Sequence, residues 1–94
     1  MIILPDAQVD LENAVDWYER QRGGLGAAFL LAMEETFDRI SRTPELHPII
    51  HRNVRRALTR QFPYAVYYFT ETDSVLVLGV FHVSRNPSEW QLRA

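Results

Sequence analysis

Three residues in the second half of the sequence have side chains that could carry out acid–base and phosphate chemistry. His82 could donate or accept a proton, because histidine changes its charge near neutral pH. Arg60 and Arg85 carry planar guanidinium groups, which can hold a phosphate or a carboxylate with two hydrogen bonds. The alternative is that His82 ends a buried strand and bonds to the backbone, while Arg85 forms a surface ion pair. The residues alone leave both interpretations open.

The end of the chain contains the residue types that most often dominate protein–protein binding energy. Arg85, Trp90 and Arg93 follow one another closely, and tryptophan and arginine are enriched among such dominant contacts. We therefore expect an exposed tail, running from Arg85 through Trp90 to Arg93, that binds a protein target. The alternative for Trp90 is that it packs as a cap on a sheet.

A metal site is not expected. The sequence has no cysteine, so it has neither a disulfide framework nor a cysteine-based zinc site. His47 and His51 are four residues apart, but Pro48 lies between them and prevents the helix that would align their side chains. We expect no cofactor either.

Two amphipathic helices are predicted in the first half. The first opens at Pro5 and ends at Gly23, and the second begins at Leu25 and stops near Thr43, because a proline follows. Each has one apolar stripe, so we expect an antiparallel hairpin that covers a sheet. Trp17 lies off the apolar stripe of its helix, so the pattern is equally compatible with an exposed and a buried side chain.

The remaining segments predict four strands, one loop and a short helix. They are a brief strand at 2–4, a rigid loop at 44–48, strands at 54–60, 62–69 and 75–83, and a short terminal helix after Pro87. The order β-α-α-β-β-β predicts a single α+β domain over residues 1–94, with the helix hairpin packed on a mostly antiparallel sheet. Alternate residues from Phe62 to Tyr68 are expected on one face of a central strand, with Leu76 and Leu78 on its neighbour.

Charge is divided unevenly along the chain. Residues 1–45 hold nine acidic residues and four arginines, a balance of −5, and residues 46–94 hold three and six, a balance of +3. This distribution permits nucleic-acid binding without arguing for it. The first residues lack the features of a signal peptide, and the apolar run at 75–81 is too short to span a membrane. We expect a soluble, cytoplasmic protein.

Several segments together resemble a known family. They are Ala14–Glu19, Leu25–Phe29, Thr43–Pro44, Arg60–Tyr68, Val75–His82, Arg85–Pro87 and Trp90. In this order they resemble the RelE/ParE toxin superfamily of bacterial type II toxin–antitoxin systems, once called plasmid stabilisation proteins. The resemblance implies a compact toxin that inhibits growth and is neutralised by a cognate antitoxin.

The resemblance leaves the cellular target open. RelE-like members are ribosome-dependent endoribonucleases that cut mRNA, whereas ParE-like members poison DNA gyrase. RNA cleavage without a metal would use His82 as acid or base, with Arg85 and Arg60 on the phosphate.

Two departures favour the ParE-like interpretation. RelE-like nucleases commonly carry an arginine directly after the tyrosine that matches Tyr64, and this chain has Ala65 there. They also tend to end in a tyrosine with basic neighbours, where this chain has Trp90 beside Glu89. We therefore expect a toxin that binds a protein such as DNA gyrase. The alternatives are the nuclease acting on the ribosome and mRNA, and a non-toxic relative that still binds an antitoxin.

Overall fold

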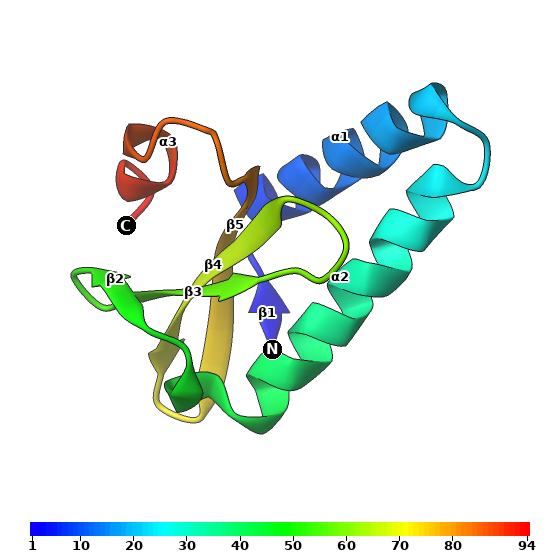
Figure 1. Cartoon of the computed structure of the whole chain (residues 1–94). Helices are drawn as coiled ribbons and strands as arrows, with labels where there is room; N and C mark the ends of the chain where they lie inside the picture. Colours follow the sequence, from blue (N-terminus) through cyan, green and yellow to red (C-terminus); the bar gives the residue numbers. More distant parts are fainter.

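Two long helices precede most of the strands. The computed structural model describes residues 1–94. The elements are β1 (Ile2–Ile3), α1 (Pro5–Gln21), α2 (Leu25–Arg42), a 3₁₀ turn η1 (Pro44–Leu46), β2 (Ile49–His51), β3 (Val54–Leu58), β4 (Tyr64–Glu71), β5 (Ser74–His82) and α3 (Ser88–Gln91). Figure 1 shows the α1–α2 hairpin and α3 on opposite sides of the sheet. The α+β class, the helix hairpin and the short C-terminal helix are confirmed.

The five strands form one sheet in the order β1-β5-β4-β3-β2. β1 pairs parallel with β5, and the other neighbours pair antiparallel. β2 was not predicted, because a three-residue edge strand directly after a proline has too little pattern to recognise. β3 is also shorter than expected, and β4 begins and ends two residues later than expected. β3 ends at Leu58 and β4 begins at Tyr64, because the chain turns between them, with Gln61 at a φ of 69° and Pro63 lacking an amide hydrogen.

The hairpin of α1 and α2 depends on one short turn. Gly24 takes a φ of 89° between the helices, a conformation that glycine adopts without a steric cost. The Glu19 carboxylate accepts hydrogen bonds from the backbone nitrogens of Gly24 and Gly26, at 3.0 Å for the shortest bond to each. It thereby satisfies free amides at the start of α2. No helix of the structure combines the length and the apolar composition needed to cross a bilayer.

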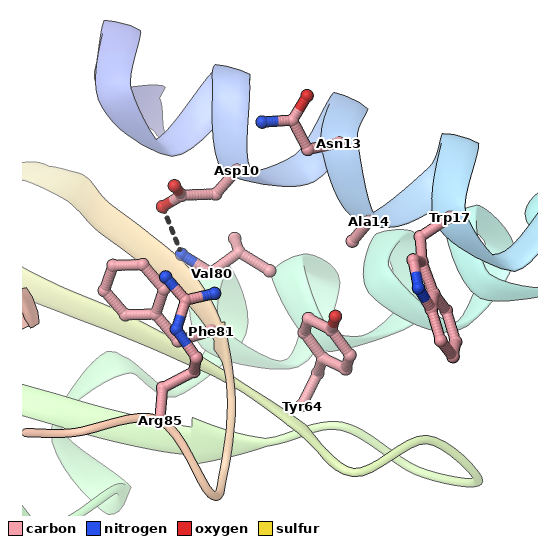
Figure 2. A pocket seen from close by; sticks show the side chains of 8 residues that line it. All are labelled: Asp10, Asn13, Ala14, Trp17, Tyr64, Val80, Phe81 and Arg85. Carbon is pink, nitrogen blue, oxygen red and sulfur yellow. Dashed lines mark hydrogen bonds between the residues drawn. The ribbon is translucent and has the colours of Figure 1, made fainter.

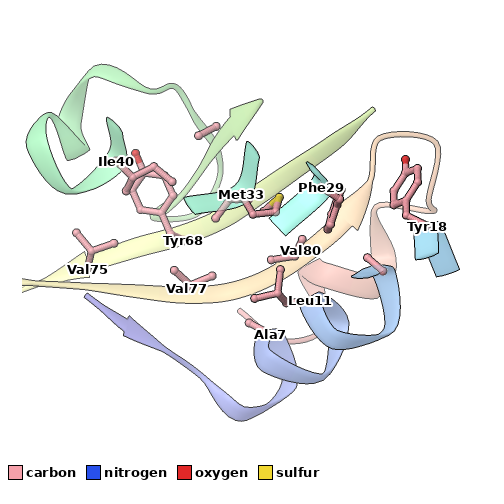
Figure 3. Packing of buried hydrophobic residues seen from close by; sticks show 13 residues of the cluster. Ala7, Leu11, Tyr18, Phe29, Met33, Ile40, Tyr68, Val75, Val77 and Val80 are labelled. Carbon is pink, nitrogen blue, oxygen red and sulfur yellow. The ribbon is translucent and has the colours of Figure 1, made fainter. Parts of the chain in front are cut away.

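The core has two parts, one on each face of the sheet. Figure 3 shows the larger cluster between the helices and the sheet, with Leu11, Phe29, Met33, Tyr68 and Val77 among its members. The smaller cluster lies on the opposite face and consists of Val54, Ala65, Tyr67, Leu78, Phe81 and Trp90. Both faces of β4 are therefore buried, as its apolar sequence predicted.

The alternation of faces along β4 is confirmed, but that along β5 is partly wrong. Phe62, Tyr64, Val66 and Tyr68 all pack toward the helices. A bulge interrupts the register of β5. Tyr67 pairs with Gly79 and the next residue, Tyr68, pairs with Val77, so one residue of β5 has no partner on β4. Leu78 is the additional residue, and it lies in the cluster on the opposite face.

Candidate functional site

A groove runs between α1 and the ends of β4 and β5. One hollow, of about 240 Å³, is lined by Asp10, Asn13, Ala14, Trp17, Tyr64, Val80, Phe81 and Arg85. An adjoining hollow, of about 500 Å³, is lined by Trp17, Tyr18, Pro63, Tyr64, His82 and Arg85. The two hollows share three residues, so we treat them as one groove. Figure 2 shows Tyr64 between Trp17 and Arg85, with its hydroxyl directed towards α1.

The aromatic wall of the groove comes from α1 and β4. Trp17 projects from α1 beside the buried stripe and is 49% exposed, with its ring edge-on to Tyr18 at 5.1 Å. Tyr64 opens β4 and packs its ring against Tyr18 and Phe29. Burial raises the pKa of the Tyr64 hydroxyl, although the positive charge of Arg85 acts in the opposite direction. The hydroxyl is therefore neutral at physiological pH and can donate or accept a hydrogen bond.

His82 lies at the end of β5, paired in register with Tyr64. Its Nδ1 accepts a hydrogen bond from the backbone nitrogen of Ser84 at 3.0 Å. Because a backbone N–H can only donate, the neutral imidazole must carry its proton on Nε2. His82 thus ends a buried strand and bonds to the backbone, and its outer nitrogen is a hydrogen-bond donor.

Arg85 forms a surface ion pair. Its Nε and Nη2 nitrogens donate to the two carboxylate oxygens of Glu89 at 2.7 and 2.8 Å. The hydrogen bond to Glu89 is the main reason that the pKa of Arg85 is raised. The guanidinium also lies 5.3 Å from the ring centroid of Phe81. The remaining nitrogen, Nη1, has no partner within the chain.

Arg60 is not part of this groove. Its Nη1 lies 3.0 Å from Glu35 of α2, and its side chain is 74% exposed. It lines a separate hollow with Ala28, Leu31 and other α2 residues. The structure therefore brings His82 and Arg85 together and places Arg60 elsewhere.

The expectation of an exposed C-terminal tail is wrong for Trp90. This side chain is only 6% exposed and stacks on Tyr67, with ring centroids 4.7 Å apart and an interplanar angle of 17°. It packs as a cap on the outer face of the sheet. The Arg93 side chain is also engaged within the chain, because its Nη1 donates hydrogen bonds to the Asp10 carboxylate at 2.6 Å and to the carbonyl oxygen of Leu78 at 3.2 Å. Arg93 lines a separate hollow with Leu4, Pro5, Asp6, Leu78 and Leu92, and of the three tail residues only Arg85 lines the groove beside Trp17 and Tyr64.

Sequence reasoning left one residue of this region undecided between exposed and buried, and it missed another. Trp17 is the exposed tryptophan, and its position off the apolar stripe was the available signal. Asp10 accepts hydrogen bonds from Arg93 and from the backbone nitrogen of Val80 at 3.1 Å. No pattern in the sequence indicates that this carboxylate meets a strand 70 residues further along the chain.

The histidines at 47 and 51 pack against different aromatic rings. The His47 ring lies 6.2 Å from that of Tyr68, and the His51 ring lies 5.7 Å from that of Trp90. These rings are on opposite faces of the sheet. The two histidines therefore do not meet as a pair of ligands.

A sequence model of one protein family matches residues 1–87, and its description is "ParE toxin of type II toxin-antitoxin system, parDE". The chain belongs to this family. The match includes the groove residues Trp17, Tyr64, His82 and Arg85, and it ends before Trp90 and Arg93. No curated protein sequence matches the chain.

A solved structure has the same ParE-like fold. It is described as "Chromosomal ParDE TA system from P. aeruginosa", and it matches with a TM-score of 0.65 and 16% sequence identity. The alignment covers 87% of this chain and 95% of that chain. At this identity the likeness establishes the shared fold alone.

Proposed function

We propose that this member of the ParE family is the toxin of a type II toxin–antitoxin pair, neutralised by a cognate antitoxin. In this proposal it inhibits growth by binding a protein target, DNA gyrase. The family match over residues 1–87 is the observation that carries the proposal.

The geometry of the groove supports binding rather than RNA cleavage. Cleavage would need a base for the 2′-hydroxyl, a cation for the phosphate and an acid for the leaving oxygen. His82 directs its Nδ1 to Ser84, so in the neutral ring no free nitrogen is available to act as a base. Arg60 lies outside the groove and Arg85 is paired with Glu89. The three candidate catalytic residues are thus not assembled around one position.

Charge favours an acidic partner. Residues 46–94 carry a balance of +3 from six arginines and three acidic residues. An antitoxin segment rich in Asp and Glu would complement this half of the chain. Co-expression with the product of the adjacent gene, followed by purification through a tag on the toxin alone, tests this partnership. The expected result is a stable complex.

The target is tested by expression in a bacterial host and by a supercoiling assay with purified DNA gyrase. We expect growth arrest with DNA damage, relief by the antitoxin and inhibition of gyrase. Cleaved mRNA that disappears with His82→Ala would instead establish the nuclease. Normal growth with retained antitoxin binding would identify a non-toxic relative.

A further inference from the structure

The groove between α1 and β4–β5 contains the two large residues of the chain that best fit a protein contact. Trp17 is half exposed, although a tryptophan side chain gains most from burial. Arg85 lies in the same groove and keeps its Nη1 free, because Glu89 occupies only Nε and Nη2. Tyr64 separates them and makes the apolar floor.

Three polar groups of the groove can only donate hydrogen bonds, whereas the Asn13 amide and the Tyr64 hydroxyl can donate or accept. The Nε2–H of His82, the free Nη1 of Arg85 and the indole N–H of Trp17 can only donate. Asp10 borders the groove, but its carboxylate is already occupied by Arg93 and by the backbone of Val80. A ligand that fits must therefore supply acceptors, and a carboxylate does so with both of its oxygens.

A nucleic-acid strand fits this groove poorly. Binding a phosphodiester backbone draws its strength from several cations. Here Arg85 is the one cationic side chain that lines the groove, and Glu89 offsets its charge. One carboxylate next to one apolar side chain matches what the groove offers, and both are ordinary features of a protein segment.

We propose that the groove formed by Trp17, Tyr64, His82 and Arg85 is the surface with which the toxin holds its protein target. The occupant is an acidic segment of that target. One carboxylate binds Nη1 of Arg85 and the Nε2–H of His82, and a neighbouring apolar side chain packs against Trp17 and Tyr64. This inference rests on the proposed function, and it replaces Trp90 with Trp17 as the tryptophan of the contact.

Three groove variants, namely Trp17→Ala, Arg85→Ala and the conservative Arg85→Lys, are compared with two control variants. Trp17→Ala and Arg85→Ala each remove one main contact. Leu31→Ala and Arg42→Ala are matched controls on α2, because Leu31 is 69% exposed and Arg42 pairs with Asp38 four residues away, as Arg85 does with Glu89. Each variant is checked for its circular dichroism and melting temperature. Growth inhibition in a bacterial host and binding to immobilised DNA gyrase are then measured.

We expect Trp17→Ala and Arg85→Ala each to weaken gyrase binding at least about tenfold, the scale of a dominant interface residue. Arg85→Lys should weaken gyrase binding less than Arg85→Ala does. Lysine keeps the positive charge, although it lacks the planar guanidinium group that forms two parallel hydrogen bonds. The control variants should bind as the unchanged protein does. All variants should still capture the antitoxin.

Three results would overturn the proposal. The first is folded groove variants that retain full toxicity and gyrase binding. The second is loss of antitoxin capture in Trp17→Ala and Arg85→Ala, which would assign the groove to the antitoxin. The third is tight binding of single-stranded RNA that Arg85→Ala abolishes. If the unchanged protein neither arrests growth nor binds gyrase, the proposed function itself fails, which is a distinguishable outcome.

Discussion

Trp17 and Trp90 have the same side chain in opposite surroundings. The Trp90 indole lies between Tyr67 and His51 on the outer face of the sheet, with centroid distances of 4.7 and 5.7 Å. The Trp17 indole packs edge-on against Tyr18 and is 49% exposed in the groove. One tryptophan therefore stabilises the fold, and the other is available for a partner.

This difference predicts unequal effects on stability. Trp90→Ala should lower the free energy of unfolding by about 3–5 kcal/mol, because it removes a buried aromatic side chain and leaves a cavity. Trp17→Ala should cost less than about 1 kcal/mol, since half of its surface is exposed already. Urea unfolding followed by circular dichroism measures both values. Equal losses would show that Trp17 belongs to the core.

The candidate site was predictable in part. His82 and Arg85 were expected together as acid–base and phosphate-binding groups near the end of one strand, and the structure places them in one hollow. Trp90 was assigned to the wrong environment, since a helix of one turn is too short to show which of its faces is apolar. Arg60 was grouped with His82 although the turn after β3 directs it to Glu35, and side-chain pairing across elements leaves no periodic signal.

At the scale of elements, the hairpin of α1 and α2 depends on close backbone approach. A Cβ atom placed on Gly26 would lie 2.8 Å from the carbonyl oxygen of Val15 and 3.0 Å from Cβ of Glu19. A Cβ atom on Gly23 would meet nothing closer than 3.9 Å. The two glycines are close in sequence but differ in whether a side chain fits.

Alanine substitutions separate these two roles. Gly26→Ala should destabilise the protein by about 1–3 kcal/mol, because α1 and α2 must move apart. This cost exceeds the gain of about 1 kcal/mol that alanine brings to a helix. Gly23→Ala should change the free energy of unfolding by less than about 0.5 kcal/mol. Thermal unfolding of the pair provides the measurement, and a stabilised Gly26→Ala would contradict the close approach.

The elements themselves were more predictable than their details. Both helices were expected within two residues of their observed bounds, because proline and glycine mark their ends and each apolar stripe repeats over several turns. The short β2 and the bulge at Leu78 were both missed, and Leu78 lies on the face away from the helices because Val75 and Val77 face them. Bulges depend on the pairing of two distant strands, so the sequence of one strand does not reveal them.

At the scale of the whole molecule, one ion pair joins the two ends of the chain. Arg93 near the C-terminus binds both carboxylate oxygens of Asp10 on α1, at 2.6 and 3.1 Å, and its guanidinium lies 4.6 Å from the centroid of the Phe81 ring. The Asp10 side chain is only 12% exposed. Arg93 thus links the end of the chain to α1 and, through the carbonyl oxygen of Leu78, to β5, and we expect this link to keep Trp90 in place.

Removal of this pair should loosen the C-terminal tail. Arg93→Ala leaves the Asp10 carboxylate with the backbone nitrogen of Val80 as its remaining partner, so we expect a loss of about 1–3 kcal/mol. In a Trp17→Phe background, Trp90 is the only tryptophan, and its fluorescence should become more accessible to acrylamide. The Arg42→Ala variant, which breaks the exposed pair with Asp38, is the control. Unchanged quenching in Arg93→Ala would mean that Trp90 holds the tail without the ion pair.

Stability at alkaline pH should depend on tyrosine. All ten basic residues are arginine, which stays protonated well above pH 12, so no lysine titrates in this range. Burial raises the pKa of Tyr68 from its ordinary value of about 10 to about 12. Its hydroxyl also donates a 2.6 Å hydrogen bond to the carbonyl oxygen of Pro44. Burial raises the pKa of Tyr18 and Tyr64 as well.

The direction of the effect follows from which state binds the proton more tightly. Below pH 10 Tyr68 is neutral in both the folded and the unfolded protein. Between pH 10 and 12 only the unfolded state loses the proton, so Tyr68 should lower the free energy of unfolding by about 1.4 kcal/mol per pH unit. Urea unfolding at several pH values measures this slope. Tyr68→Phe should reduce the slope, although it also removes the bond to Pro44. An identical slope in Tyr68→Phe would show that Tyr68 ionises equally easily in both states.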